Sequence, residues 1–300
     1  MLTMNSLGNH QSLIEELSVV TATRLAEARP ILRGDDLKAA VHEARRIAKE
    51  QRAILRAIQP ATGPAHARHN LRLRDAAHRL SSARDAAALI DAVDEQLVAH
   101  ARSPDEVAVI AAVRAWLVGR LASIDMADLR RDTRLLVAEL EATPPLMLEL
   151  ELDRPQAAAL AAGVARTYRR GRRAMRHARS RDDAESWHEW RKRAKDHRYQ
   201  LELLLDMRPR TLASRHDACK RLTQALGGDH DLIVLEAALA ADTPLDATGD
   251  ALVLELIART RVELRRVAAA LGTQVYAQSP RKLTRDVARR WIRHTGSGRR

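Results

Sequence analysis

Residues 42–49 read His42-Glu43-Ala44-Arg45-Arg46-Ile47-Ala48-Lys49, and residues 188–195 repeat the pattern as His188-Glu189-Trp190-Arg191-Lys192-Arg193-Ala194-Lys195. The offset is 146 positions, and Arg52 recurs as Arg198 at the same offset. A second motif keeps this register further along the chain: the recurring positions are Leu80, Asp85 and Leu89, then Leu226, Asp231 and Leu235. The residues that recur in the first motif are mostly cationic. The sequence therefore predicts a duplicated helical unit that gathers positive charge for a long polyanion.

The spacing within residues 35–59 predicts an amphipathic helix. Its apolar stripe consists of Leu37, Val41, Ala44, Ala48, Leu55 and Ile58. A cationic row lies one residue further round and consists of Lys38, His42, Arg45, Lys49, Arg52 and Arg56. Like charges three or four residues apart on a helix repel each other by a few tenths of a kcal/mol per pair. We expect a bound anion to offset this repulsion, where the row meets a neighbouring helix.

The composition predicts a soluble protein with a positive second half. Of the 300 residues, 46% are hydrophobic and 30% are charged, which excludes a wholly disordered chain. Residues 1–152 carry 20 basic and 21 acidic side chains, whereas residues 153–300 carry 31 and 18. The single cysteine, Cys219, excludes an internal disulfide and is typical of a reducing compartment. With no recognisable secretory signal and no apolar stretch of membrane-spanning length, we expect a cytoplasmic protein without a membrane contact.

The chain is expected to be all-α. Ala, Leu and Arg dominate, and no segment shows the sustained period-2 alternation of a strand. Because prolines and glycines are expected between helices, the predicted helices are 10–29, 35–59, 65–100, 104–122, 125–142, 155–180, 183–207, 210–241, 246–271 and 281–294. The expected N-caps are Asp35, Ser103 and Thr243. Residues 148–152 are expected to form an extended linker, and residues 295–300 a basic tail.

These motifs resemble the CHAD family, named for its histidine-bearing α-helical domain. The resemblance rests on the pattern His-x-x-Arg-x-x-x-Lys-x-x-Arg, present twice, and on Leu226-Gly227-Gly228-Asp229-His230-Asp231. It covers residues 10 to 294 and implies two four-helix bundles related by a pseudo-twofold, one over 10–143 and one over 155–294. It also implies binding of inorganic polyphosphate. The first half departs from the pattern, because Ser81-Ser82 stands where the second half has glycines.

The candidate polyphosphate-binding residues are the two repeated rows and the basic side chains next to them. The first row supplies His42, Arg45, Arg46, Lys49, Arg52 and Arg56, and the second supplies His188, Arg191, Lys192, Lys195 and Arg198. Arg169, Arg173, Lys220 and Arg221 are candidate walls of the groove. Arg offers forked donors to phosphate oxygens and Lys a mobile point charge. Asp85 and Asp231 are expected to orient an Arg or His of their own half. The alternative interpretation is that these charges form solvated helix faces and that the histidines are partly buried hydrogen-bonding groups.

Binding without catalysis, without a metal and without a cofactor is the expected activity. His188-Glu189-Trp190-Arg191-Lys192 lacks the second histidine of a zinc motif, and Gly227-Gly228 is not followed by the Lys-Ser or Lys-Thr of a phosphate loop. The expected role is that of an adaptor on polyphosphate granules, with granule proteins as partners. One alternative is a nucleic-acid-binding protein, against which the scarcity of aromatic residues argues. A second alternative is a metal-dependent phosphohydrolase.

Overall fold

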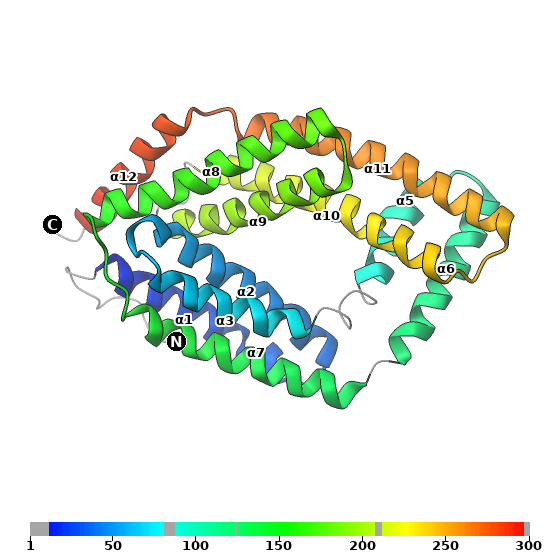
Figure 1. Ribbon diagram of the computed structural model, residues 1–300, viewed down its shortest axis with the longest axis horizontal. Coiled ribbons are helices and arrows are strands. Elements are labelled where there is room, and N and C mark those ends of the chain that lie inside the picture. The colour runs from blue at the N-terminus through cyan, green and yellow to red at the C-terminus, as the bar shows by residue number, and fades with distance from the viewer. Residues whose placement is uncertain (1–11, 81–87, 124, 208–211, 297–300) are drawn as a thin grey trace.

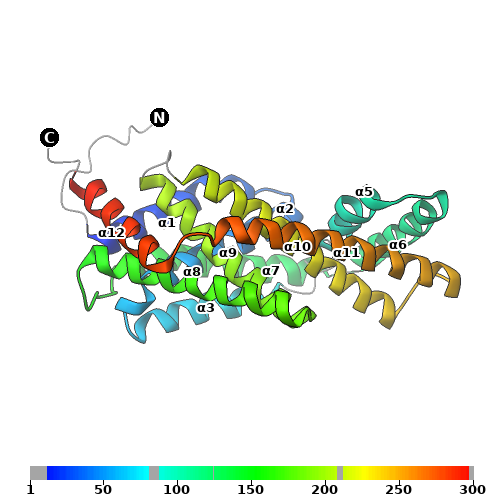
Figure 2. The same ribbon diagram turned by 90° about the horizontal axis from the view of Figure 1, so that it is seen from above.

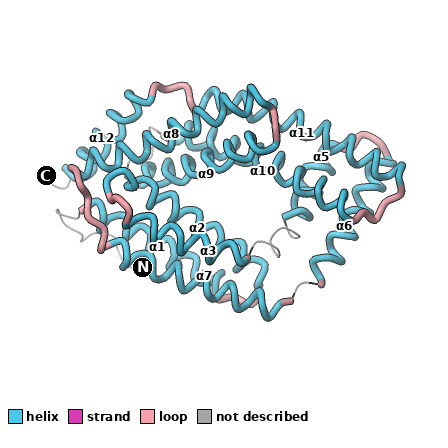
Figure 3. Tube along the Cα trace, in the orientation of Figure 1, coloured by secondary structure: helices cyan, strands magenta, loops and turns pink. Residues whose placement is uncertain are grey.

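The computed structural model describes residues 12–80, 88–123, 125–207 and 212–296 (Figure 1). These residues form α-helices and short helical turns and contain no strand, as Figure 3 shows. The helices are α1 (Leu13–Leu32), α2 (Leu37–Ile58), α3 (Ala65–Arg79), α5 (Val98–His100), α6 (Pro104–Ala122), α7 (Met126–Met147), α8 (Gln156–Arg181), α9 (Ala184–Met207), α10 (Ala213–Ala241), α11 (Ala247–Val275) and α12 (Pro280–Gly296). The expectation of an all-α protein is therefore confirmed.

Two of the three predicted N-caps were wrong. Ser103 caps α6 as predicted, and its Oγ accepts a hydrogen bond from the backbone N of Glu106. The cap of α2 is Asp36 instead of Asp35, because the Asp36 carboxylate accepts from the N of Ala39. In α11 the cap is Asp246 instead of Thr243. In both corrected cases the helix begins at the carboxylate that reaches the third following N–H, which is the group a cap has to satisfy.

The prediction that every proline lies between helices was also wrong. Pro30 lies in the last turn of α1, and Pro144 and Pro145 lie near the end of α7. A proline in a helix deprives the carbonyl four residues earlier of its N–H partner. For Pro144 that carbonyl belongs to Leu140, and the Gln51 side chain of α2 donates to it at 3.2 Å. A side chain from another helix therefore supplies the missing hydrogen bond and allows α7 to continue to Met147.

The helix predicted over 65–100 is not uniform. Helix α3 ends at Arg79, and residues 81–87 lie outside the described part of the chain. Residues 88–92 are helical again, and a turn of π-helix, Val93–Leu97, leads into α5. The linker predicted over 148–152 does lack helix, although it begins as a turn at Leu148 and Glu149.

A first hydrophobic core joins helices from both halves of the chain. Helix α2 packs against α1, α3 and α7 and also against α8 and α9. Gly163 of α8 lies directly against the backbone of Ala57 in α2, and a Cβ on it would lie 1.8 Å from the Ala57 carbonyl oxygen. Because only glycine permits this contact, Gly163 fixes how α8 crosses α2. Buried residues of α9, α10, α11 and α12 complete the core.

A second hydrophobic core lies at the other end of the elongated molecule, away from the N-terminus of α1 and the end of α12 (Figures 1 and 2). Residues 89–97 and α6 contribute Val93, Val113 and others, and the adjoining halves of α10 and α11 contribute Leu235, Val253 and others. Each core thus draws on residues from before and after position 152. Packing of these distant segments removes apolar surface from water, and each Å² so buried stabilises the fold by about 25 cal/mol. This burial holds the two halves together.

No single helix in the described ranges is both long and apolar enough to cross a membrane. Helices α6 and α7 meet that test only when they are taken together as a bent pair.

Candidate functional site: a cavity lined by both halves

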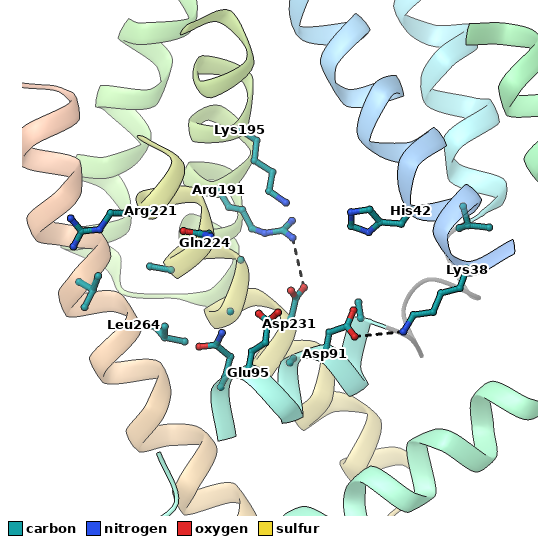
Figure 4. A pocket seen from close by; sticks show the side chains of 18 of the residues that line it. Lys38, His42, Asp91, Glu95, Arg191, Lys195, Arg221, Gln224, Asp231 and Leu264 are labelled. Atoms are coloured by element: carbon teal, nitrogen blue, oxygen red, sulfur yellow. Dashed lines mark ion pairs between the residues drawn. The ribbon is translucent and has the colours of Figure 1, made fainter. Parts of the chain in front are cut away.

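A cavity of about 770 Å³ is lined by seven parts of the chain. Its walls come from α2, from residues 88–96, from the adjoining ends of α6 and α7, and from α9, α10 and α11. Figure 4 shows the side chains around it. A site of this kind depends on the crossing of helices that are distant in sequence.

Basic side chains from the cationic row of α2 and from the second repeated motif meet at this cavity. Lys38 and His42 of α2 line it, as do Arg191 and Lys195 of α9. In Figure 4 the His42 ring and the Arg191 and Lys195 side chains lie on opposite sides of the opening and point toward one another. Arg221 of α10 also lines the cavity, further from His42. Members of both predicted rows therefore share one concave surface.

Carboxylates accompany these cations. Arg191 is 8% exposed, and its Nη2 lies 3.7 Å from Oδ1 of Asp231 on α10. Lys38 Nζ lies 3.7 Å from Oδ1 of Asp91. Glu95 is a third lining carboxylate. Asp231 and Asp91 hold the two cations at the cavity wall, and a phosphate with more charge could compete for them.

Two adjacent glycines in α10 have different surroundings. A Cβ on Gly228 would lie 3.0 Å from the side chain of Gln96 and 3.1 Å from that of Leu264, so this glycine allows close packing between helices. A Cβ on Gly227 would meet nothing within 4 Å, although Gly227 also lines the cavity. A helical glycine costs about 1 kcal/mol relative to alanine. Packing explains that cost at Gly228 but not at Gly227, where the helix backbone instead stays open to an occupant of the cavity.

His188 is placed differently from His42. It is not one of the residues lining the cavity. Its Nδ1 lies 3.1 Å from Nδ1 of His230 on α10, and the two ring centres are 4.3 Å apart. Burial lowers the pKa of His188, and the nearby charges of Lys192 and Arg191 lower it further. The two predicted histidines therefore occupy different environments, and the His188 ring packs against His230 between α9 and α10.

Three arginines of the first row face α3 and α9 and join helices together. Arg45 donates to the carbonyl oxygen of Ala77 at 2.7 Å. Arg52 donates to Oδ1 of Asn70 at 3.0 Å, and burial lowers the pKa of Arg52 to about 10. Arg56 donates to Asp196 of α9 at 2.9 Å. Lys49 is partly buried in the same row. None of these four is among the residues that line the cavity.

The remaining predicted cations do not line the cavity. Three form ion pairs along their own helix: Arg46 with Glu43 and Glu50, Lys192 with Glu189, and Arg198 with Glu202. Three others, Arg169, Arg173 and Lys220, are exposed on α8 and α10. Asp85 lies outside the described residues.

Asp91, Glu95 and Gln224 also line the cavity, although no sequence pattern singles them out. None of the three belongs to a repeated motif. Lys38 was placed in the cationic row without being counted among the binding candidates. Lys38 lies one helical turn before His42 and therefore on the same face, and this spacing would have identified it as a binding candidate.

A comparison with protein families identifies a CHAD domain over residues 21–240. The chain belongs to the CHAD family. A comparison with curated proteins found no match. The matched part of this CHAD chain includes α2, α9 and α10, so it contains all the cavity-lining cations, whereas α11 lies beyond it. In the described part of the chain, no group of three or more His, Cys, Asp or Glu side chains is arranged to hold a metal ion.

Proposed function

We propose that this CHAD protein binds inorganic polyphosphate at the cavity. The observation that carries the proposal is that His42 of one motif, with Lys38 of the same cationic row, and Arg191 and Lys195 of the other motif line one concave surface. A linear polyphosphate carries charge along its whole length and offers neither an aromatic nor an apolar face. Convergent ammonium and guanidinium groups suit such a ligand, since hydrogen bonds between charged partners are about twice as strong as neutral ones.

The two halves are proposed to be tandem repeats related by a pseudo-twofold, within one domain over 10–294. Adding 146 to the first residues of α1, α2 and α6 gives positions within three residues of the starts of α8, α9 and α11. The contacts agree with this pairing, because α1 packs on α2 and α7 while α8 packs on α9 and α12. Residues 268–291 of α11 and α12 share the first core, which supports a domain that continues beyond the family match.

The protein is proposed to bind without turnover, as an adaptor on polyphosphate granules in the cytoplasm. This role needs a surface that holds a polyanion and does not need a reacting group at the cavity. Granule proteins would then be its macromolecular partners. Nucleic acid is a poorer fit, because none of the described residues that line the cavity is a Trp or Tyr on which a base could stack.

The decisive experiment compares two lysines of α9 that differ in position but carry the same charge. Lys195→Gln removes a cation from the cavity, whereas Lys192→Gln removes one that pairs with Glu189 and does not line it. Calorimetric titration with long-chain polyphosphate should show about a ten-fold weaker affinity for Lys195→Gln, since a hydrogen bond to a charged group contributes about 1.5 kcal/mol. Lys192→Gln should change the affinity by less than about two-fold.

Equal losses in both variants would show that net charge, and not the cavity, governs binding. Competition tests the nucleic-acid alternative: long polyphosphate should displace bound DNA or RNA at physiological salt, and displacement of polyphosphate by nucleic acid would mean that the polyanion was wrongly chosen. Phosphate release from polyphosphate in the presence of a divalent metal would favour the phosphohydrolase alternative.

A further inference from the structure

A second cavity, of about 490 Å³, is lined by the end of α9, the start of α10, and α12 with the loop before it. It shares no lining residue with the first cavity. In Figure 1, α12 lies at the end of the elongated molecule opposite α5 and α6. Polyphosphate in the first cavity therefore does not account for this second one.

The charged side chains of the second cavity are mostly cationic. Arg215 of α10 and Lys282 and Arg290 of α12 line it, and Asp286 of α12 is the single carboxylate among the described residues that do so. Three cations against one carboxylate leave a net charge of +2. Within the described ranges of the chain, neither Arg215 nor Lys282 forms an ion pair. The cavity therefore gathers positive charge that the described carboxylates do not neutralise.

Hydrogen bonds hold the carboxylate and the loop of the second cavity in place. Oδ2 of Asp286 accepts from Nε2 of Gln278 at 2.6 Å, and the carbonyl oxygen of Gln278 accepts from the hydroxyl of Tyr168 at 2.7 Å. Helix α12 begins directly after this loop, and a helix N-terminus adds a partial positive charge to that of the side chains. Asp286 is thus already engaged with the protein, and Arg215 and Lys282 are the groups that a ligand can bind.

We propose that the second cavity binds the phosphate group of a compact ligand. A phosphate group carries about two negative charges at neutral pH, which matches the net charge of the lining residues. Arg215 supplies the planar fork of donors that fits phosphate oxygens, and Lys282 supplies a mobile point charge. A volume of about 490 Å³ lies within the usual range for small-molecule sites. The phosphate belongs either to a separate small compound or to the end of a polyphosphate chain, and experiment separates these two sources.

Calorimetric titration of the whole protein with inorganic pyrophosphate tests the second cavity. Lys282→Gln should weaken pyrophosphate binding about ten-fold, because it removes a hydrogen bond to a charged group. Lys220→Gln is the matched control, since Lys220 is exposed on α10 and lines neither cavity; it should change the affinity by less than about two-fold. Asp286→Asn should tighten binding about three-fold, because it removes a negative charge beside the ligand, and a damaged fold would not produce such a gain. Equal losses in the two lysine variants would overturn the inference.

The first cavity provides the means to separate this inference from the proposed function. In Lys195→Gln protein, which has lost a cation of the first cavity, Lys282→Gln should still weaken pyrophosphate binding about ten-fold. Loss of pyrophosphate binding in Lys195→Gln but not in Lys282→Gln would place pyrophosphate in the first cavity and overturn the inference.

Titration with long-chain polyphosphate identifies the source of the phosphate. If the ligand is a separate compound, Lys282→Gln should bind long polyphosphate like the unchanged protein, whereas a chain end in the second cavity would make Lys282→Gln weaken polyphosphate as well. Pyrophosphate binding that depends on Lys282, in a protein that does not bind long polyphosphate, would refute the proposed function only.

Discussion

Replacing Gly227 by alanine should make the protein more stable and a weaker polyphosphate binder. Gly227 lies within α10, and a Cβ built on it meets no atom within 4 Å. Alanine is favoured over glycine inside a helix by about 1 kcal/mol, and here no clash subtracts from that gain. The new methyl group projects into open space at the cavity. A phosphate chain that lies against the α10 backbone would have to move away from it, and crowding of this kind costs about 1–3 kcal/mol.

Two measurements on one protein test this pair of opposite effects. Urea unfolding followed by circular dichroism should show a rise of about 1 kcal/mol in the free energy of unfolding of Gly227→Ala. Calorimetry should show polyphosphate affinity reduced by about ten-fold or more, since 1.4 kcal/mol corresponds to a factor of ten. Gly228→Ala is the neighbouring control: its Cβ would lie 3.0 Å from the Gln96 side chain, so it should gain little or no stability.

Unchanged polyphosphate affinity in a stabilised Gly227→Ala protein would refute the reasoning about the site. It would show that the ligand does not approach the α10 backbone. Loss of stability in Gly227→Ala would refute the reasoning about the fold, since it would mean that the space beside this glycine is filled.

Three further perturbations test the fold. Burial lowers the pKa of His197 to about 3, so at intermediate pH the unfolded chain binds a proton that the native protein does not. Between about pH 6.5 and pH 3, His197 should therefore lower the free energy of unfolding by about 1.4 kcal/mol for each unit that the pH falls. Urea unfolding of His197→Leu at pH 6 and 5 should lack that part of the slope. Asp229→Ala should lower the free energy of unfolding, measured in urea, by about 3 kcal/mol, because the nearly buried Asp229 carboxylate pairs with Arg265 and Arg261 at 2.9 and 3.3 Å. A loss below about 1 kcal/mol would show that solvent screens the two arginines. Gly163→Ala should lower the melting temperature strongly, because its Cβ would lie 1.8 Å from a backbone oxygen of α2, and an unchanged melting temperature would contradict the close crossing of α2 and α8.

The helices could be predicted from the sequence because helix formation depends mainly on local properties. Propensity, capping groups and the spacing of apolar residues act within a few positions of each other, so the approximate bounds of α6, α8 and α9 agree with the predictions. The exceptions have two causes: a contact with another helix, or a choice between two adjacent residues that could each cap the helix. Helix α7 continues past its predicted end because Gln51 of α2 satisfies the carbonyl that Pro144 leaves without a backbone donor. Asp36 caps α2 in place of the adjacent Asp35.

By itself the sequence determined that cations would follow one face of α2 and one face of α9, beside the residues that form the core. It did not determine which of them reach the cavity. Helical spacing fixes the direction of a side chain around its own axis, whereas its partner depends on the helix that crosses there. Arg45 meets a carbonyl of α3 while the equivalent Arg191 lines the cavity, and His42 faces the cavity while His188 packs against His230. Equivalent residues thus receive different neighbours, because contacts between helices more than a hundred residues apart are decided only when the chain packs.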